Sequence, residues 1–300
     1  MKMMCIKSIM CVFSGNADEE TALSTAFNLA YTAKGSLRVL HIAAPPILYG
    51  AAIGAAYASG PYPNGDLADI LEKDARELTE TALKAVIRLS NSRMVTLVEE
   101  GVQATAGRAQ ASFRALIGTV SECLPAEGRS VDLVVAGYDN SYGGNFETIL
   151  TTLFKTGSPV LAIPRLSDVV LSETGYARTV AVAWDGSLTA SRALRAAMPY
   201  LVRAETVYLV SVEGMNDPVD TVGNRDIMSY LAVHGISAQF IHCERVAHGI
   251  GHILLEKAYD LKADLLVMGA YGRGHIGEMI LGGVSNHLLK HSRLPLFLAH

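Results

Sequence analysis

The sequence of 300 residues has no cluster of basic side chains. Only 18% of its residues are charged, and the formal net charge is −4. Nucleic-acid binding depends on the neutralisation of phosphates by grouped lysine and arginine side chains. The composition therefore argues against a nucleic acid as a partner.

Cysteine is also scarce. The four cysteines are Cys5, Cys11, Cys123 and Cys243, and none of them belongs to a CxxC pair. Their spacing matches no pattern of zinc or haem ligands. We interpret them as small hydrophobic residues of a protein in a reducing compartment.

No stretch of the chain is apolar for long enough to span a membrane. The segment Met1–Phe13 is interrupted by Lys7 and is followed by no A-x-A cleavage site. The segment Leu40–Tyr57 contains Pro45 and Pro46 and falls short of about 20 consecutive apolar residues. We therefore expect a cytoplasmic protein without a membrane partner.

The most informative feature of the sequence is an internal repeat. In each half an apolar strand is followed by a turn, an amphipathic helix and a second apolar strand. In the second half these are Thr179–Trp184, Asp185–Ser187, Ala190–Val202 and Val207–Val212. In the first half they are Ser8–Phe13, Ser14–Asn16, Glu20–Ala33 and Leu37–Ile42.

The ends of the two halves repeat as well. Asp132–Gly137 matches Asp264–Gly269, and each half closes with a strand that follows a proline. Strands that alternate with helices at this spacing indicate parallel βαβ units. We predict an α/β fold of two tandem, doubly wound, Rossmann-like parallel-sheet domains, at residues 1–165 and 176–300.

The first half is longer than the second in its middle section, by about 39 residues. A loop rich in proline, glycine and tyrosine over Ala43–Gly65 contributes part of this excess. The pattern that follows predicts a long helix over Asp66–Leu89. The linker between the halves is expected at Arg165–Tyr176, where polar residues and glycine gather without periodicity.

The second half carries a motif suited to phosphate binding. The strand Leu265–Met268 leads into Gly269 and Gly272, and nine residues later Gly282 and Gly283 precede a helix over Ser285–His291. Glycines between a strand and a helix let backbone amides approach an anion, and the helix N-terminus adds partial positive charge. Asp185 follows the first strand of this half and would face the same crevice, where its carboxylate can accept hydrogen bonds from ribose hydroxyls.

This G-x2-G-x9-G spacing, together with Asp-Gly-Ser after the first strand, resembles the ATP-binding class of universal stress proteins, here as a tandem pair. The resemblance implies a stress-response regulator that binds ATP, AMP or ADP, with or without magnesium. It implies that Asp185 contacts the nucleoside and that the Val212 backbone faces the adenine edge. It further places Gly269 and Gly272 beside ribose and phosphates, and Gly282, Gly283 and Ser285 at the phosphates.

The sequence departs from this pattern in both halves. Where the family has serine or threonine after the third glycine, the second half has Gly283, and Ser285 is the hydroxyl that could compensate. In the first half Ser14 replaces the aspartate and Asn140 the second glycine. The first phosphate loop is also four residues shorter, and Glu147 falls where it would repel a phosphate. We predict that the first half does not bind ATP in the family's manner and is a structural or regulatory partner.

Two histidine pairs have the i, i+4 spacing of metal ligands on a helix, His248 with His252 and His287 with His291. Neither has an acidic third ligand at a useful spacing. We interpret them as surface or capping histidines and predict no metal site. Trp184 could stack on a base, although a tryptophan at the end of a strand is as often part of the core.

Two alternatives to a nucleotide-binding regulator stay open. One is an enzyme that hydrolyses ATP slowly or transfers phosphate, and the other is a scaffold without a ligand. Around the loop only Arg273, His275 and Glu278 could assist catalysis, and they form no evident constellation. We therefore assign no catalytic residue.

The resemblance also bears on assembly. The strands Val160–Ile163 and Leu296–Ala299 resemble the family's dimerisation strand. They imply that the halves pack together as a pseudo-dimer within one chain. Two chains are then expected to form a homodimer.

Overall fold

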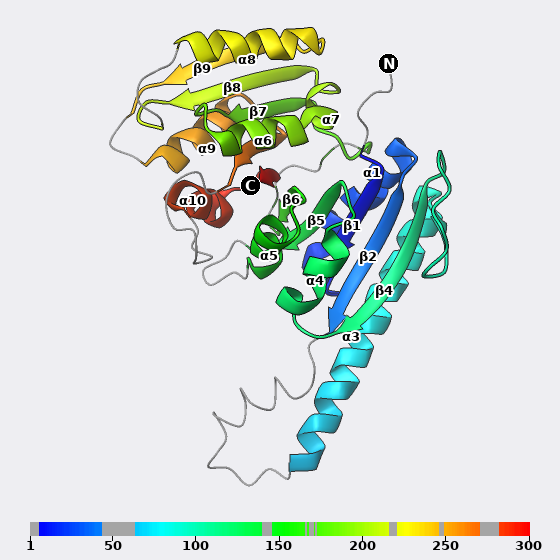
Figure 1. Ribbon diagram of the computed structural model, residues 1–300. Helices are drawn as coiled ribbons and strands as arrows, with labels where there is room; N and C mark the ends of the chain where they lie inside the picture. The colour runs from blue at the N-terminus through cyan, green and yellow to red at the C-terminus, as the bar shows by residue number, and fades with distance from the viewer. Residues whose placement is uncertain are drawn as a thin grey trace.

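The computed structural model describes residues 6–43, 64–139, 146–165, 167, 171, 173–215, 221–245, 249–270 and 282–300. These residues form one continuous sheet of eleven strands in the order β3-β4-β2-β1-β5-β6-β11-β10-β7-β8-β9. Helices cover both faces of the sheet (Figure 1). The predicted Rossmann-like α/β class is thus confirmed.

The N-terminal half contributes the first six strands. They are β1 (Ser8–Val12), β2 (Ser36–Ala43), β3 (Thr96–Leu97), β4 (Gln110–Ile117), β5 (Leu133–Tyr138) and β6 (Val160–Pro164). Its helices are the 3-10 turn η1 (Ala17–Glu19), α1 (Glu20–Ala33), α3 (Asn64–Arg93), α4 (Val120–Gly128) and α5 (Glu147–Lys155). All strand pairs within this half are parallel.

The C-terminal half repeats the arrangement without the extra edge strand. Its strands are β7 (Thr179–Ala183), β8 (Thr206–Val212), β9 (Ala238–Cys243), β10 (Leu265–Gly269) and β11 (Leu296–Ala299). Its helices are α6 (Leu188–Ala196), α7 (Met198–Leu201), α8 (Thr221–Val233), α9 (Ile250–Asp260) and α10 (Gly283–His291). The single helix predicted over Ala190–Val202 is wrong, because the structure divides it into α6 and α7. Pro199 lies at the start of α7, where its missing amide disrupts helical hydrogen bonding least.

Both halves fix the start of their first strand by the same contact. In the N-terminal half, Asp132 Oδ2 accepts the backbone amides of Lys7 and Ser8 at 2.7 and 2.9 Å. In the C-terminal half, Asp264 Oδ2 accepts those of Arg178 and Thr179 at 2.9 Å each. The two aspartates begin the repeated DLVVAG and DLLVMG segments. The repeated aspartate therefore makes the same structural contact in both halves.

The two halves join through their last strands. β6 and β11 pair antiparallel, with Ala162 opposite Leu296 and Val160 opposite Leu298. This confirms the expected pseudo-dimer within the chain. Each of these strands now has a neighbour on both sides. A second chain would therefore have to pair through another surface.

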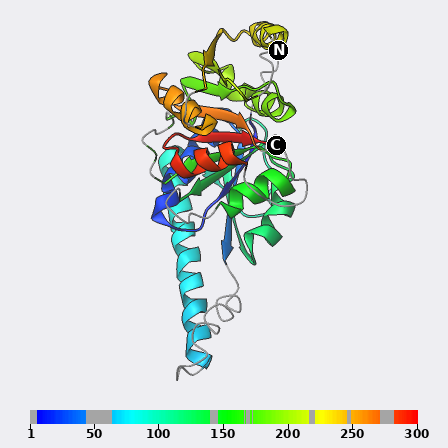
Figure 2. The same cartoon turned by 90° about the vertical axis from the view of Figure 1, so that its left-hand side faces the viewer.

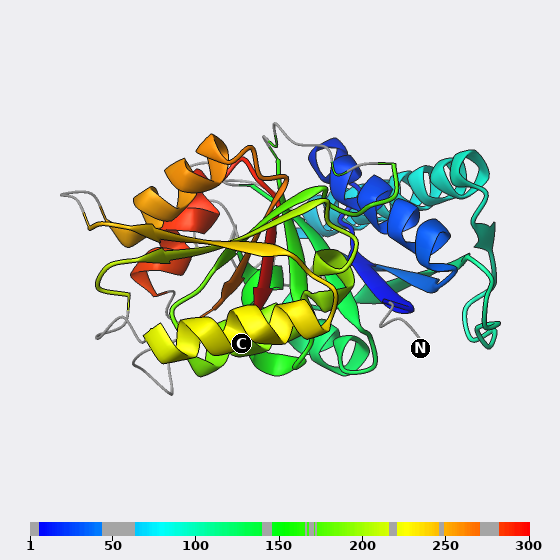
Figure 3. The ribbon, with the colours of Figure 1, turned by 90° about the horizontal axis from the view of Figure 1, so that it is seen from above.

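Two hydrophobic cores lie on opposite faces of the sheet, and each runs through both halves. One core packs the sheet against α1, α3, α6 and α8. The other packs it against α4, α5, α9 and α10. Viewed from above, α8 and the pair α9–α10 lie on opposite sides of the strands (Figure 3). Successive side chains along a strand point to opposite faces, so Ile9 and Cys11 enter one core and Met10 the other.

The helix α3 has 30 residues and extends well beyond the sheet at its N-terminal end (Figures 1 and 2). It is longer than the predicted Asp66–Leu89. Its C-terminal part packs on the core through Ala82, Val86 and Leu89. Exposed ion pairs such as Arg76–Glu72 support the remainder weakly. Most of the predicted Ala43–Gly65 loop lies outside the described residues.

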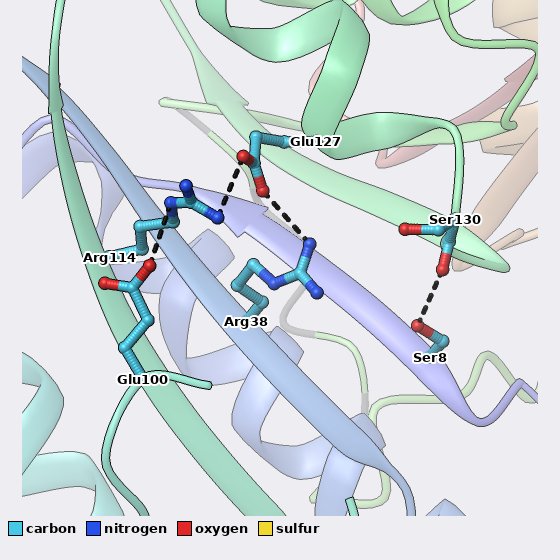
Figure 4. A network of polar contacts seen from close by, with 6 residues as sticks. All are labelled: Ser8, Arg38, Glu100, Arg114, Glu127 and Ser130. Carbon is cyan, nitrogen blue, oxygen red and sulfur yellow. Dashed lines mark hydrogen bonds and ion pairs between the residues drawn. The ribbon is translucent and has the colours of Figure 1, made fainter. Parts of the chain in front are cut away.

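Charged side chains hold α4 to the outer strands of the N-terminal half (Figure 4). Glu127 of α4 forms ion pairs with Arg38 of β2 at 3.2 Å and with Arg114 of β4 at 3.0 Å. Arg114 also lies 3.0 Å from Glu100. The Glu127 side chain is only 13% exposed, so water screens these pairs less than ordinary surface pairs.

Within the described residues, no helix is long and apolar enough to cross a membrane.

Candidate functional site

Asp185, Val212 and Gly269 lie at the carboxyl ends of β7, β8 and β10. These strands are neighbours and run parallel, with Val182 opposite Val267 and Ala183 opposite Val210. Continued by two residues, the same registers place Asp185 beside Val212, and Gly269 beside Trp184. Open α/β sheets bind ligands at this edge, at the point where the strand order reverses. Here that point is β7, because β8 lies on one side of it and β10 on the other.

Asp185 is held by a turn of its own. Its Oδ1 accepts the Ser187 amide at 2.9 Å, and Gly186 between them has φ of +71°, a left-handed value that favours glycine. The Ser187 hydroxyl in turn accepts the Ala190 amide and caps α6. The Asp-Gly-Ser sequence thus fixes a carboxylate at the end of β7 and starts the next helix.

Val212 is the last residue of β8 and is buried. Its carbonyl oxygen accepts the Met215 amide at 3.1 Å. A carbonyl has two acceptor lone pairs, so this bond does not exhaust it. The expected contact of the Val212 backbone with an adenine remains a prediction.

Gly269 is required by packing. A Cβ atom at this position would lie 2.4 Å from the Thr189 carbonyl carbon and 2.5 Å from the Ala190 nitrogen. The backbone at the start of α6 therefore rests directly on the end of β10. Sequence reasoning assigned this glycine to ligand approach and did not identify its contact with Thr189, because the spacing of the motif says nothing about which helix crosses the strand.

The N-terminus of α10 is open. Gly282 is the N-cap, no side chain caps the helix, and its first turn contains no acidic residue. Side chains at Gly282 and Gly283 would meet no atom of the described residues within 4 Å. The first amides of a helix lack intrahelical partners, so this end is suited to an anion.

Ser285 is the third residue of α10 and is only 4% exposed. The amides of the first turn have no partner within the helix and are the donors available at this end. Gly272 lies outside the described residues, as do Arg273, His275 and Glu278.

The corresponding edge of the N-terminal half is covered by α3. Gly15 follows β1 with φ of +94°, and a Cβ there would lie 2.8 Å from the Leu78 carbonyl oxygen of α3. Nearby, His41 of β2 is buried and its Nδ1 lies 3.0 Å from the Phe13 carbonyl oxygen. Its Nε2 lies 3.1 Å from the Thr79 hydroxyl of α3. Burial lowers the pKa of His41, although the bond to Phe13 opposes this, and the ring is best described as neutral.

The carboxylate of Glu19 lies at this carboxyl edge of the N-terminal half. Glu19 Oε2 accepts the Ser14 amide at 2.8 Å, and a Cβ at Gly137 would lie 2.9 Å from Glu19 Cγ. Burial raises the pKa of Glu19, while the hydrogen bond from Ser14 opposes the shift. By the alignment of the repeats, Ala190 stands in the C-terminal half where Glu19 stands here. Sequence reasoning missed Glu19, although its alignment with an alanine was a visible signal.

Glu147 lies where the sequence placed it. It is the first residue of α5, the position that Gly283 holds in α10. A carboxylate there would oppose an incoming phosphate. Asn140, which replaces the second glycine, lies outside the described residues.

The histidines form a different arrangement from the predicted helical pairs. His248 lies outside the described residues, whereas His252, His287 and His291 gather between α9 and α10. His287 is half-buried: its Nε2 lies inside without a hydrogen-bond partner in the described chain, and its ring packs over Gly251. Burial, with smaller contributions from His291 and His252, lowers its pKa. Within the described residues no group of three His, Cys, Asp or Glu side chains has the geometry of a metal site.

Trp184 belongs to the core. It is buried in the cluster that packs α6 on the sheet, and its amide donates to the Val210 carbonyl oxygen at 2.8 Å. Stacking on a base would require its indole ring to leave this cluster. The core interpretation of Trp184 is therefore the one that the structure supports.

Comparison with known proteins locates the chain among related folds. Residues 177–300 match the model of the universal stress protein family. No curated protein matches the chain.

Solved structures extend the similarity to the whole length of the chain. A universal stress protein from Archaeoglobus fulgidus has a TM-score of 0.68 at 17% identity, with 97% of this chain and 96% of that one covered. A putative universal stress protein from Pseudomonas aeruginosa has a TM-score of 0.51 at 14% identity, with 100% and 95% covered. A protein of unknown function from Pseudomonas aeruginosa has a TM-score of 0.53 at 14% identity, with 98% and 92% covered. At these identities the similarity establishes the fold.

Proposed function

From the membership of residues 177–300 in the universal stress protein family, we propose that the chain is an adenine-nucleotide-binding regulator with one nucleotide site, in its C-terminal half. In this proposal residues 176–300 form the binding domain and residues 1–165 a degenerate partner domain. The ligand is ATP, ADP or AMP, and magnesium accompanies the phosphates where they need further neutralisation.

The observation that carries the proposal is the pairing of a fixed carboxylate with an uncapped helix N-terminus at one edge of the sheet. Asp185 is oriented by the Ser187 amide and can accept hydrogen bonds from ribose hydroxyls. The first amides of α10 are free of side-chain caps and can donate to phosphate oxygens. A nucleoside phosphate presents these two chemistries at its two ends.

The remaining predicted residues fit between these ends. Val212 ends the strand beside Asp185, so its backbone would meet the base. Gly269 and Gly272 would lie along the ribose and phosphates, and the backbone of Gly282, Gly283 and Ser285 would hold the terminal phosphates. We assign the Ser285 amide to the ligand, because the first amides of a helix lack partners within it.

The N-terminal half supports the proposal by contrast. Its edge holds the Glu19 carboxylate, it is covered by α3, and α5 begins with Glu147. Each of these features opposes a phosphate or occupies its space. We therefore assign this half no nucleotide and a structural or regulatory role.

The experiment is a calorimetric titration of ATP, with and without magnesium, into the wild type, Asp185→Ala and Ser14→Ala. Loss of a hydrogen bond to a charged group costs about 1.5–3 kcal/mol, which weakens binding about tenfold to a hundredfold in Asp185→Ala. Ser14→Ala is the matched change in the other half and should bind ATP like the wild type. Equal affinity in wild type and Asp185→Ala would contradict the assignment.

The same samples separate the two alternative functions. An enzyme would release phosphate from bound ATP over the course of the titration, and a ligand-free scaffold would show no heat of binding in any variant. Binding without phosphate release is the result that the regulator predicts.

A further inference from the structure

A cavity of about 270 Å³ lies beside α1 in the N-terminal half, and neither edge of the sheet described above uses it. Its wall combines one side of α1, the last residue of α3 and the segment that joins the two halves. The polar side chains at its surface are those of Glu20, Thr21, Ser24, Thr25, Asn28, Arg93 and Glu173. A surface helix normally presents such a side to water, whereas here other segments form further walls of a cavity that stays open to solvent.

Asn28 is the first sign that the cavity is a binding site. The residue is 6% exposed, yet its carboxamide forms no hydrogen bond with any side chain or backbone group of the described chain. Its carboxamide atoms are not among the fully buried, unsatisfied atoms of the described chain, because they line the cavity. Thr25 lies three residues before Asn28 on the same side of α1 and is also buried. Its hydroxyl donates to the Thr21 carbonyl oxygen at 2.8 Å. The Asn28 amide is thus available to a molecule inside the cavity.

Arg93 is the second sign. It ends α3, and its Nη2 donates to the Ser24 hydroxyl at 3.3 Å. Its Nε is buried without a hydrogen-bond partner among the described residues, and no carboxylate of those residues forms an ion pair with it. A guanidinium group presents its donors in a fork that matches a carboxylate. The cavity therefore contains an arginine whose natural partner is missing from the described protein.

Two acidic side chains, Glu20 and Glu173, also line the cavity. Glu20 already pairs with Arg88. Glu173, from the segment between the halves, forms no ion pair with another described residue. An ammonium group is the complement of this carboxylate, and the hydroxyls of Thr21 and Ser24 can accept further ammonium hydrogens.

We propose that this cavity binds a small zwitterion of the α-amino-acid class. Its carboxylate accepts hydrogen bonds from Arg93 and Asn28, and its ammonium group faces Glu173. The volume of about 270 Å³ suits a molecule of this size, and the cavity is lined by both a guanidinium and a carboxylate, which a zwitterion can contact together.

The bound molecule would contact the segment that joins the halves. A Cβ at Gly175 would lie 2.7 Å from Leu29 Cγ, so this segment rests directly on α1 just beyond the cavity. The next residue, Tyr176, packs its ring against Tyr200 of the C-terminal half with centroids 5.0 Å apart. Occupancy of the cavity therefore stabilises the junction between the halves.

The experiment screens the full chain against the common α-amino acids at millimolar concentration by thermal unfolding, followed by calorimetry with the compound that raises Tm most. The analogues of that compound without the amino group and without the carboxyl group are titrated in parallel. We expect one site per chain and at least tenfold weaker binding of either analogue, because each lacks one charge-assisted contact.

Three variants decide the location. Arg93→Gln and Asn28→Leu should weaken binding at least tenfold, whereas Arg129→Gln, an exposed arginine at the end of α4, should leave it unchanged. ATP affinity should be the same in all three, which separates this proposal from the nucleotide site. The proposal is overturned if no amino acid raises Tm, or if binding survives both Arg93→Gln and Asn28→Leu.

Discussion

The carboxyl edges of the two halves have the same strands in the same order and yet offer a ligand opposite surroundings. In the C-terminal half, β7 ends at a carboxylate fixed by its own turn, and α10 begins with glycines and no cap. In the N-terminal half, β1 ends at Ser14, whose amide is taken by Glu19, and α5 begins with Glu147. The helix α3, which is longer than its counterpart α8, then packs over Gly15.

The comparison shows that the fold supplies a position for a site, while a few side chains decide whether the position can be used. Glu19 and α3 do more than remove ligand contacts, because they occupy the space and satisfy the polar groups that a ligand would satisfy. Such a half can keep the fold without a nucleotide.

The largest effect on stability is expected from alanine at the glycine that ends β10. In Gly269→Ala the new methyl group meets the backbone of Thr189, which cannot move without shifting α6. We expect a loss of about 1–3 kcal/mol in the free energy of unfolding, measured in urea. Gly282→Ala, where a Cβ meets nothing, should change the stability by less than about 0.5 kcal/mol. Equal losses in the two variants would show that α6 does not press on Gly269.

A second substitution brings a feature of the N-terminal half into the C-terminal half. Gly283→Glu places a carboxylate where α5 has Glu147, and about 1.4 kcal/mol of repulsion would weaken ATP binding about tenfold. Adenosine binding should change little, and Gly283→Gln is the uncharged control. The two ligands are compared by calorimetry, and equal weakening of both would place the phosphates away from α10.

A third substitution tests how firmly α3 covers the N-terminal edge. Thr79→Val removes the hydroxyl that contacts His41 Nε2 and leaves that buried nitrogen without this partner. We expect the unfolding free energy to fall by about 1 kcal/mol, with ATP affinity unchanged. Thr81→Val is the control on an exposed side of the same helix, where the hydroxyl contacts only the backbone. A drop in ATP affinity in Thr79→Val would link α3 to the nucleotide site and contradict the division between the halves.

The smallest effects concern pH and have opposite signs in the two halves. Burial raises the pKa of Glu19, so its ionisation destabilises the folded state at neutral pH, and this penalty disappears as pH falls toward the pKa of an unfolded glutamate. Burial lowers the pKa of His287, so its contribution to stability is lost as pH falls below the pKa of an unfolded histidine, about 6.5.

Replacing either side chain should remove its contribution to the pH dependence of the unfolding free energy, and the two contributions have opposite signs. Glu19→Gln should be more stable than the wild type at pH 7, with a difference that shrinks on acidification. His287→Gln should lose less stability than the wild type between neutral and mildly acidic pH. Urea denaturation at several pH values measures both, and shifts of the same sign would show that one of the two side chains is not buried in solution.

Much of the fold was predictable because it depends on local pattern. The period of apolar residues located β1, α1 and β11 to within about one residue, and the repeated DLVVAG and DLLVMG segments indicated the tandem arrangement. The helix over Ala190–Val202 was predicted as unbroken because its apolar spacing continues through Pro199. The full length of α3 was missed because the polar residues Ser90–Arg93, which end the helix, continue no apolar period.

The site was predictable where sequence neighbours create it and not where distant segments meet. The Asp185 turn and the open N-terminus of α10 follow from adjacent residues. The contact of α3 with Gly15 and that of Glu19 with Gly137 join positions far apart in the chain, and no motif records them. The same holds for Asn28, Arg93 and Glu173, which come together only through the packing of α1, α3 and the segment between the halves.

The most direct test of the account is the number of ATP molecules that one chain binds at saturation, measured by equilibrium dialysis with labelled ATP. The division between an open C-terminal edge and a filled N-terminal edge predicts one molecule per chain. Two molecules per chain would contradict it, because the edge that holds Glu19 and lies beneath α3 would then have accepted a nucleotide.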